Sequence, residues 1–152
     1  MPVGHVITCT CGSFLHRFGS GWSEEEHHNC GTMQLEKRSD GQLYINGKKV
    51  ERHLSPNQKG DKIVQGHKLH KELSDQLILC ACVLDYLLKH PELIPEDWKN
   101  GYTFFWGTIF RDSDGDLSVA YLFWLGRRWS RSYDWLDGDW GSLGPAARLA
   151  SE

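Results

Sequence analysis

The stretch WLGRRWSRSYDWLDGDWGSLGPAA, residues 124–147, is the main basis for predicting the structure of the second half of this chain. Its four tryptophans alternate with Gly, Ser, Asp and Arg, which are typical of surfaces. We interpret the tryptophans as a fixed framework that completes the core, each burying on the order of 150–250 Å². The residues between them are expected to form an exposed surface.

Two hairpins are predicted. YTFFWGTIF (102–110) and LSVAYLFW (117–124) flank the turn RDSDGD and read as an apolar antiparallel pair. QLYINGKKVERHL (42–54) alternates on both sides of Asn46-Gly47, a dipeptide suited to a type I′ turn. Residues 1–38 read as irregular.

One main helix is predicted from a single apolar stripe with helical spacing, made by Leu69, Leu73, Leu77, Cys80, Leu84 and Leu87. It starts after Gly66 or at Ser74, and Pro91 ends it. Residues 91–99 predict a short second helix. The expected fold class is therefore α+β: these helices on small antiparallel sheets, with much ordered loop.

Length and composition suit one domain over residues 1–152. The sequence has no run of eighteen apolar residues, so we expect no membrane span. The first residues lack the pattern of a signal peptide. Five cysteines is an odd number, which argues against a disulfide framework.

Two metal sites are candidates. Zinc takes four N or S ligands, and the N-terminal part offers Cys9, Cys11 and Cys30 with His28, His16 or His27. The alternative is a set of thiols and surface histidines without metal. Asp112, Asp114 and Asp116 alternate as calcium ligands do, but Asp-Gly between two strands is first a turn signal.

The charge is uneven along the chain. Residues 48–71 hold seven Lys or Arg against two acids, which suits phosphate binding or a solvated face. The net charge of −3 argues against nucleic acid as the partner. The chain contains none of the common catalytic or nucleotide-binding motifs, and we expect no enzyme activity.

The composition of residues 125–144 resembles that of an antibody combining site, with aromatic and Arg anchors among Ser, Gly and Asp. Together with VLDYLLKHPELIPEDWK (83–99) and FFWGTIFRDSDGDLSVAYLFW (104–124), the tail resembles the variable proteins of diversity-generating retroelements, found in phages, bacteria, archaea and archaeal viruses. The resemblance covers roughly Leu77 to Ala150. It implies a C-type-lectin-like fold whose C-terminal surface is altered by adenine-directed mutagenesis and binds a ligand.

The genetic code offers a separate check. Changing the adenines of an Asn codon cannot produce Lys, Glu, Gln, Met or Trp, and the Trp codon contains no adenine. All seventeen non-Trp residues among positions 125–144 belong to the reachable set. On the composition of the whole chain this has a chance of about one in twenty-five.

The resemblance assigns each tail position to one of two sets. The variable, ligand-binding positions are Leu125, Gly126, Arg127, Ser130, Arg131, Ser132, Tyr133, Asp134, Asp137, Gly138, Asp139, Ser142, Leu143 and Gly144. The framework positions are Trp124, Trp129, Trp135, Trp140, Pro145, Ala146 and Ala147. Arg128 fits either set.

Three functions compete at this stage. The first is a non-catalytic display protein with a receptor or adhesion role, which binds a protein or glycan and reaches a virion or cell surface through a partner. The second is a zinc-stabilised interaction or nucleic-acid-binding module, which would rest on the N-terminal Cys/His group and the basic stretch Lys48–Lys71. The third is an enzyme without recognisable motifs. The sequence leaves homo-oligomerisation open.

Overall fold

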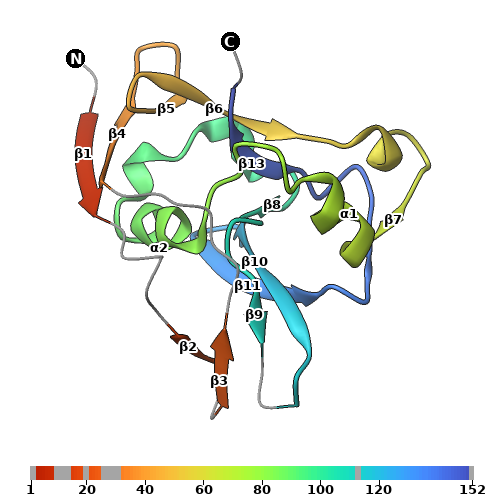
Figure 1. The fold of residues 1–152 in the computed structure, drawn as a ribbon. Coiled ribbons are helices and arrows are strands. Elements are labelled where there is room, and N and C mark those ends of the chain that lie inside the picture. The colour runs from red at the N-terminus through yellow and green to blue at the C-terminus, as the bar shows by residue number, and fades with distance from the viewer. Residues whose placement is uncertain (1–2, 9–14, 19–20, 25–31, 112–113, 151–152) are drawn as a thin grey trace.

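The computed structural model describes residues 3–8, 15–18, 21–24, 32–111 and 114–150, with side chains for residues 33–110 and 114–150. The class is α+β, as predicted. Two helices, α1 (Gly66–Glu72) and α2 (Ala81–Lys89), lie beside one large, mostly antiparallel sheet (Figure 1). Short 3-10 turns occur at Pro56–Gln58, Pro91–Leu93 and Glu96–Lys99, the last two where a short second helix was predicted.

The main sheet has nine strands, larger than the small sheets expected. In spatial order, eight of them are β1 (Val3–Thr8), β4 (Thr32–Lys37), β5 (Leu43–Ile45), β6 (Lys48–His53), β13 (Ala146–Leu149), β8 (Thr103–Phe104), β10 (Leu117–Trp124) and β11 (Trp129–Trp135). The ninth, β9 (Phe110–Arg111), also pairs with β10. Only the β13–β8 pair is parallel among the described strands.

The expectation that residues 1–38 are irregular is wrong. Four strands lie in this part, including β2 (Leu15–Phe18) and β3 (Gly21–Glu24), which form a separate two-stranded sheet. In β4 the side chains of Met33 and Leu35 are buried while Gln34 is exposed. Thr32–Lys37 therefore follows the period of two that a half-buried strand requires.

The hairpin predicted over residues 42–54 is confirmed. β5 and β6 pair antiparallel on either side of Asn46 and Gly47, whose φ angles are 50° and 82°. Two successive positive φ angles define the type I′ turn that Asn-Gly favours. Asn46 also accepts a hydrogen bond through Oδ1 from the Gln34 N–H at 2.8 Å, which ties the turn to β4.

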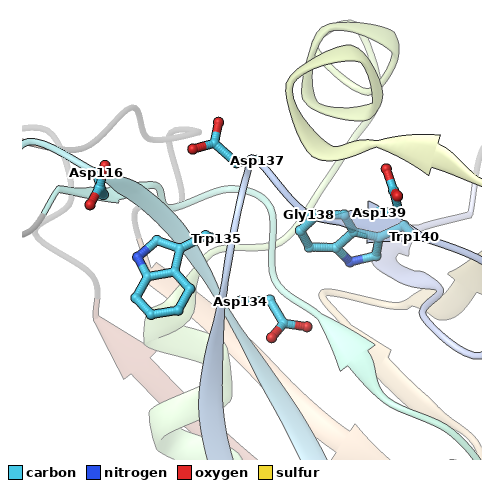
Figure 2. Close-up of a pocket in the computed structure, with 7 residues that line it drawn as sticks. All are labelled: Asp116, Asp134, Trp135, Asp137, Gly138, Asp139 and Trp140. Atoms are coloured by element: carbon cyan, nitrogen blue, oxygen red, sulfur yellow. The ribbon is translucent and has the colours of Figure 1, made fainter.

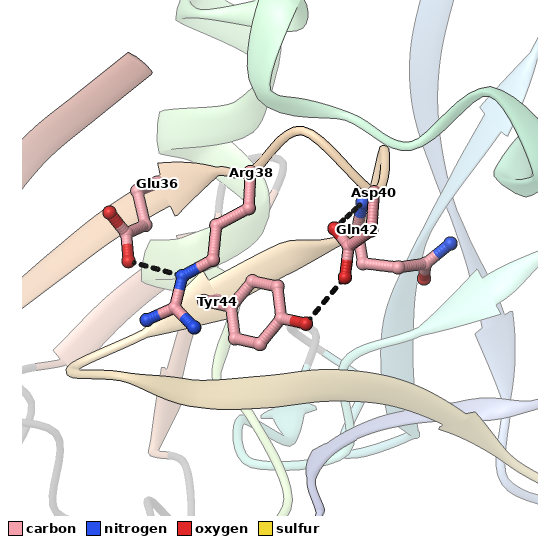
Figure 3. A network of polar contacts seen from close by, with 5 residues as sticks. All are labelled: Glu36, Arg38, Asp40, Gln42 and Tyr44. Carbon is pink, nitrogen blue, oxygen red and sulfur yellow. Dashed lines mark hydrogen bonds and ion pairs between the residues drawn. The ribbon is translucent and has the colours of Figure 1, made fainter. Parts of the chain in front are cut away.

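The β4–β5 turn is closed by a polar network that the sequence did not reveal (Figure 3). Asp40 accepts hydrogen bonds from the Tyr44 hydroxyl at 2.6 Å and the Gln42 N–H at 2.9 Å, and these bonds lower the pKa of its carboxyl. Arg38 donates from Nε to Glu36 at 2.7 Å, and its guanidinium lies 3.9 Å from the centre of the Tyr44 ring. The network is solvent-facing and stabilises the turn.

The prediction of one continuous main helix is wrong. α1 ends at Glu72 and α2 begins at Ala81, because the chain turns at residues 73–75 and then runs beside β13 over residues 77–79. The Leu79 N–H donates to the Ala147 carbonyl at 3.0 Å, and the Leu77 carbonyl accepts from the Leu149 N–H at 2.9 Å. The apolar stripe is mostly buried, but it belongs to two helices and a connecting segment.

The hairpin predicted over residues 102–124 forms only in part. β8 and β9 both pair with β10, but after the Phe105 N–H, which donates to the Ala120 carbonyl, residues 106–109 leave the ladder between them. Gly107 passes so close to the connecting segment that a Cβ there would lie 2.8 Å from the backbone of Leu79. This close approach interrupts the strand.

Two hydrophobic clusters hold the fold together. One packs α2 against the sheet through residues such as Leu84, Leu87 and Leu122. The other packs α1 against Trp106 and Trp140. Within the part of the chain that is described, no helix has the length and apolar character to cross a membrane.

Candidate ligand-binding surface

The tail begins with the hairpin of β10 and β11. These strands pair antiparallel, with Trp124 opposite Trp129. The ring centroids of the two tryptophans are 5.2 Å apart in an edge-to-face arrangement. The turn between them is closed by the Leu125 N–H donating to the Arg128 carbonyl at 2.8 Å, and it requires the φ of 73° at Gly126. The tryptophan pair therefore fixes the base of a tight, exposed turn.

One face of β11 points toward α2. Tyr133 packs against the α2 cluster and meets Phe110 edge-to-face at 5.3 Å. Arg131 forms an ion pair with Asp85 of α2 and donates a hydrogen bond to the Tyr133 hydroxyl at 2.8 Å. These two predicted variable residues are thus half-buried and hold the hairpin against the helix.

The other face of β11 carries Ser130, Ser132 and Asp134, because side chains alternate along a strand. Ser130 and Ser132 lie opposite Phe123 and Tyr121 of β10. These two rings are 5.5 Å apart, and Tyr121 also meets the exposed Tyr102 edge-to-face at 5.6 Å. The face is an open aromatic surface bordered by small hydroxyl groups.

The chain then returns to the sheet through residues 136–145, and buried side chains fix this loop. Leu136 and Trp140 are buried, and Trp140 packs between Phe104 and Trp106 with ring centroids 5.3 and 5.1 Å away. A Cβ on Gly66 would lie 2.5 Å from the Trp140 ring. Glycine at the start of α1 therefore allows the helix to approach the loop.

A buried glutamine positions the same loop. Gln58 donates through Nε2 to the carbonyls of Gly144 at 2.9 Å and Gly141 at 3.1 Å, and its Oε1 accepts from the Ser55 N–H. At the other end of the loop, His67 Nε2 lies 2.9 Å from Asp137 Oδ1, and the Gly66 N–H donates to the Gly138 carbonyl at 2.9 Å. Sequence reasoning missed Gln58, although Ser55-Pro56-Asn57-Gln58 has the Ser-x-x-Gln spacing of a capping box, which the structure forms.

An acidic pocket of about 610 Å³ opens beside this loop. Figure 2 shows its lining residues: Asp116, Asp134, Trp135, Asp137, Gly138, Asp139 and Trp140. Partial loss of water at the pocket wall raises the pKa of the Asp134 carboxyl. Carboxylates beside an exposed indole make this end of the tail negatively charged.

A second pocket, of about 420 Å³, lies at the opposite end of β11, and we call it the tip cleft. Its lining residues are Leu88, Pro91, Glu96, Lys99, Trp124, Arg127, Arg128 and Trp129. The tail thus presents a basic end and an acidic end, joined by the serine-lined face of β11.

The predicted variable positions are placed as follows. The exposed positions are Leu125, Gly126, Arg127, Asp134, Asp137, Gly138, Asp139, Ser142 and Leu143. Half-buried are Ser130, Arg131, Ser132 and Tyr133. Gly144 is buried, and Arg128 is exposed.

The framework positions are mostly, but not all, in the interior. Trp140, Pro145, Ala146 and Ala147 are buried, whereas Trp124 and Trp129 are half-buried. The expectation that every tail tryptophan completes the core is wrong for Trp135, whose exposed fraction is 57%. Trp135 ends β11 and borders the acidic pocket instead, and the buried residue at this point is Leu136.

The candidate metal ligands fall largely outside the described residues. This holds for Cys9, Cys11, Cys30, His28 and His27, and for Asp112, while His16 lies in β2 with only its backbone described. Asp114 and Asp116 flank the Gly115 turn. Among the residues whose side chains are described, no group of three His, Cys, Asp or Glu is arranged to hold a metal ion.

The basic stretch 48–71 does not act as a single patch. Lys48 and Lys49 are exposed at the β5–β6 turn, and Lys62 and Lys68 line a pocket near α1. Arg52 donates to the carbonyls of Asn100 and Asp97 at 2.6 and 2.9 Å, a structural role.

Comparison with family models, curated proteins and solved structures finds no match to this chain.

Proposed function

We propose that this chain is a non-catalytic ligand-binding display protein with a C-type-lectin-like domain, whose C-terminal surface is diversified by adenine-directed copying from a retroelement. The proposal rests on the family resemblance of residues 77–150 and on the reachable codons of residues 125–144. Its ligand is a macromolecule, and the variable positions of the tail are its contacts.

The observation that carries the proposal is the division of the tail by burial. Thirteen of the fourteen positions assigned as variable are exposed or half-exposed, and Gly144 is the exception. Surface substitutions usually change stability by less than about 0.5 kcal/mol, so such a surface tolerates many sequences. Trp140, Pro145, Ala146 and Ala147, which the copying process would leave unchanged, are buried.

The two faces of β11 should differ in how many substitutions they tolerate. Changes at Ser130, Ser132 and Asp134 alter the open face and leave the α2 contacts intact. Changes at Arg131 or Tyr133 remove the contacts to Asp85 and Phe110 and therefore have a cost in stability. We expect variation to be broadest on the open face and narrower on the face toward α2.

Deep sequencing of the 3′ end of this gene in its source population tests the proposal. The expected result is substitutions concentrated in codons 125–144, with every Trp codon intact and Gly144 seldom changed. A tail that is uniform across many independent isolates would refute the proposal. Codons 102–110 are a matched control, because they encode a similarly aromatic segment outside the variable region.

A further inference from the structure

The tip cleft is built from both constant and changeable parts of the chain. Leu88 and Pro91, from the end of α2 and the turn after it, form an apolar wall. Lys99 contributes from the turn Glu96–Lys99, and the β10–β11 hairpin closes the cleft. A volume of about 420 Å³ suits one or two side chains of a bound partner.

The cleft has an excess of positive charge. Lys99 pairs with Glu96 at 2.6 Å, and this pair is neutral overall. Arg127 and Arg128 are both exposed, and neither guanidinium forms an ion pair or hydrogen bond within the described part of the chain. Two guanidinium groups that have no internal partner and border one cleft favour carboxylate groups, because each can bind a carboxylate through two parallel hydrogen bonds.

The aromatic rings of the cleft favour a peptide over a sugar. The Lys99 ammonium lies 4.3 Å from the centre of the Trp124 ring and so covers one face of that ring. Trp124 also forms the edge-to-face pair with Trp129. A sugar ring needs an open aromatic face to stack on, whereas an apolar side chain needs only the wall formed by Leu88, Pro91 and the indole edges.

We propose that the tip cleft of this variant binds an acidic segment of a partner protein, with the partner's carboxylates on Arg127 and Arg128 and an apolar side chain against Leu88 and Pro91. This inference rests on the proposed function and names the ligand class for the present tail. The apolar wall and Lys99 lie outside the diversified segment, so they serve any tail. The two arginines set the preference for negative charge.

The test measures binding of a short fluorescein-labelled peptide of Glu-Leu-Glu-Gly repeats by fluorescence anisotropy. The full chain is compared with R127S/R128S and with K48S/K49S, which removes the same charge from the distant β5–β6 turn. R127Q/R128Q keeps longer polar side chains than serine, without the charge, and serves as a second variant if the serine variant is poorly folded. Oligogalacturonate, a carboxylated sugar, is the competing probe.

The expected result is peptide binding that weakens with salt and falls at least about tenfold in the arginine variants but not in K48S/K49S. Failure of the parent chain to bind the peptide would overturn the inference, as would equal losses in both double variants. Arginine-dependent binding of oligogalacturonate alone would replace the protein partner by an acidic glycan. None of these results bears on whether the tail varies in the population, which sequencing decides separately.

Discussion

Replacing Gly144 by Ser tests how the returning loop is packed. Gly144 is assigned to the variable set, yet a Cβ there would lie 3.0 Å from Trp140 Cδ1 and 3.1 Å from Phe104 Cε1. Both rings are buried and pack on each other, so neither moves away freely. Gly144 does not have a positive φ, so the obstacle is space and not backbone strain.

Overpacking of this kind costs about 1–3 kcal/mol. For a chain of this size each kcal/mol lowers the melting temperature by about 2–4 °C, so we expect G144S to melt about 2–12 °C below the parent. Gly141 is the matched control in the same loop. A Cβ there would first meet the exposed Ile63 side chain at 3.7 Å, an ordinary contact.

Thermal denaturation followed by circular dichroism measures both variants under the same conditions. We expect G141S to melt close to the parent. An equal loss in G141S would show that the loss is not specific to the contacts of position 144 with Trp140 and Phe104. Equal melting temperatures for G144S and the parent would show that the loop repacks around position 144. Gly144 would then be as open to variation as its neighbours.

Two further predictions concern polar groups. Gln58→Leu removes both hydrogen bonds to the loop carbonyls of Gly144 and Gly141. Because a buried carbonyl left without a partner costs about 1–3 kcal/mol, the free energy of unfolding measured with denaturant should fall by at least that amount. An unchanged unfolding midpoint would contradict the positioning role of Gln58. The pKa of Asp40 is lower in the folded state because of its bonds from Tyr44 and Gln42, so its contribution to stability is present above the unfolded pKa of about 3.9 and is lost as pH falls through the folded pKa. Asp40→Asn should therefore lower stability near pH 7 but not at the acid end, and a deficit independent of pH would refute this assignment.

Local patterns in the sequence predicted some elements well. Asn46-Gly47 specifies its turn through the positive φ angles of both residues, and neighbours along the chain suffice to read it. The turn at Asp114–Asp116 and the apolar character of β10 are local in the same sense. The α+β class followed from such elements.

Features that depend on residues far apart in the chain could not be predicted from the sequence. The stripe from Leu69 to Leu87 has helical spacing, but the backbone of Leu79 bonds with Ala147 and Gly107 instead of continuing the helix. Hydrogen bonds to β13 and the packing against Gly107 outweigh the local preference there. The missed strand β4 is different, because its alternation of Met33 and Leu35 with polar residues was present in the sequence.

The same distinction applies to the candidate surface. Alternation of tryptophans with small polar residues indicated an exposed tail on a fixed frame, and most positions lie where this pattern places them. The alternation could not predict that Leu136 is buried and Trp135 exposed, because a bend at the end of β11 decides which of the two side chains points inward. It also could not show that the two ends of β11 carry opposite charge.

The place of β13 in the sheet has a consequence for any process that rewrites the preceding codons. β13 follows the tail in the chain, yet it lies in the interior of the sheet between β6 and β8. A copying error that inserts or deletes a base upstream shifts the reading frame before Ala146, and the resulting polypeptide lacks the strand that joins the two halves of the sheet. Base substitutions preserve that strand and frameshifts destroy it. Under the proposed diversification, only tails copied in register would yield a chain with a complete sheet.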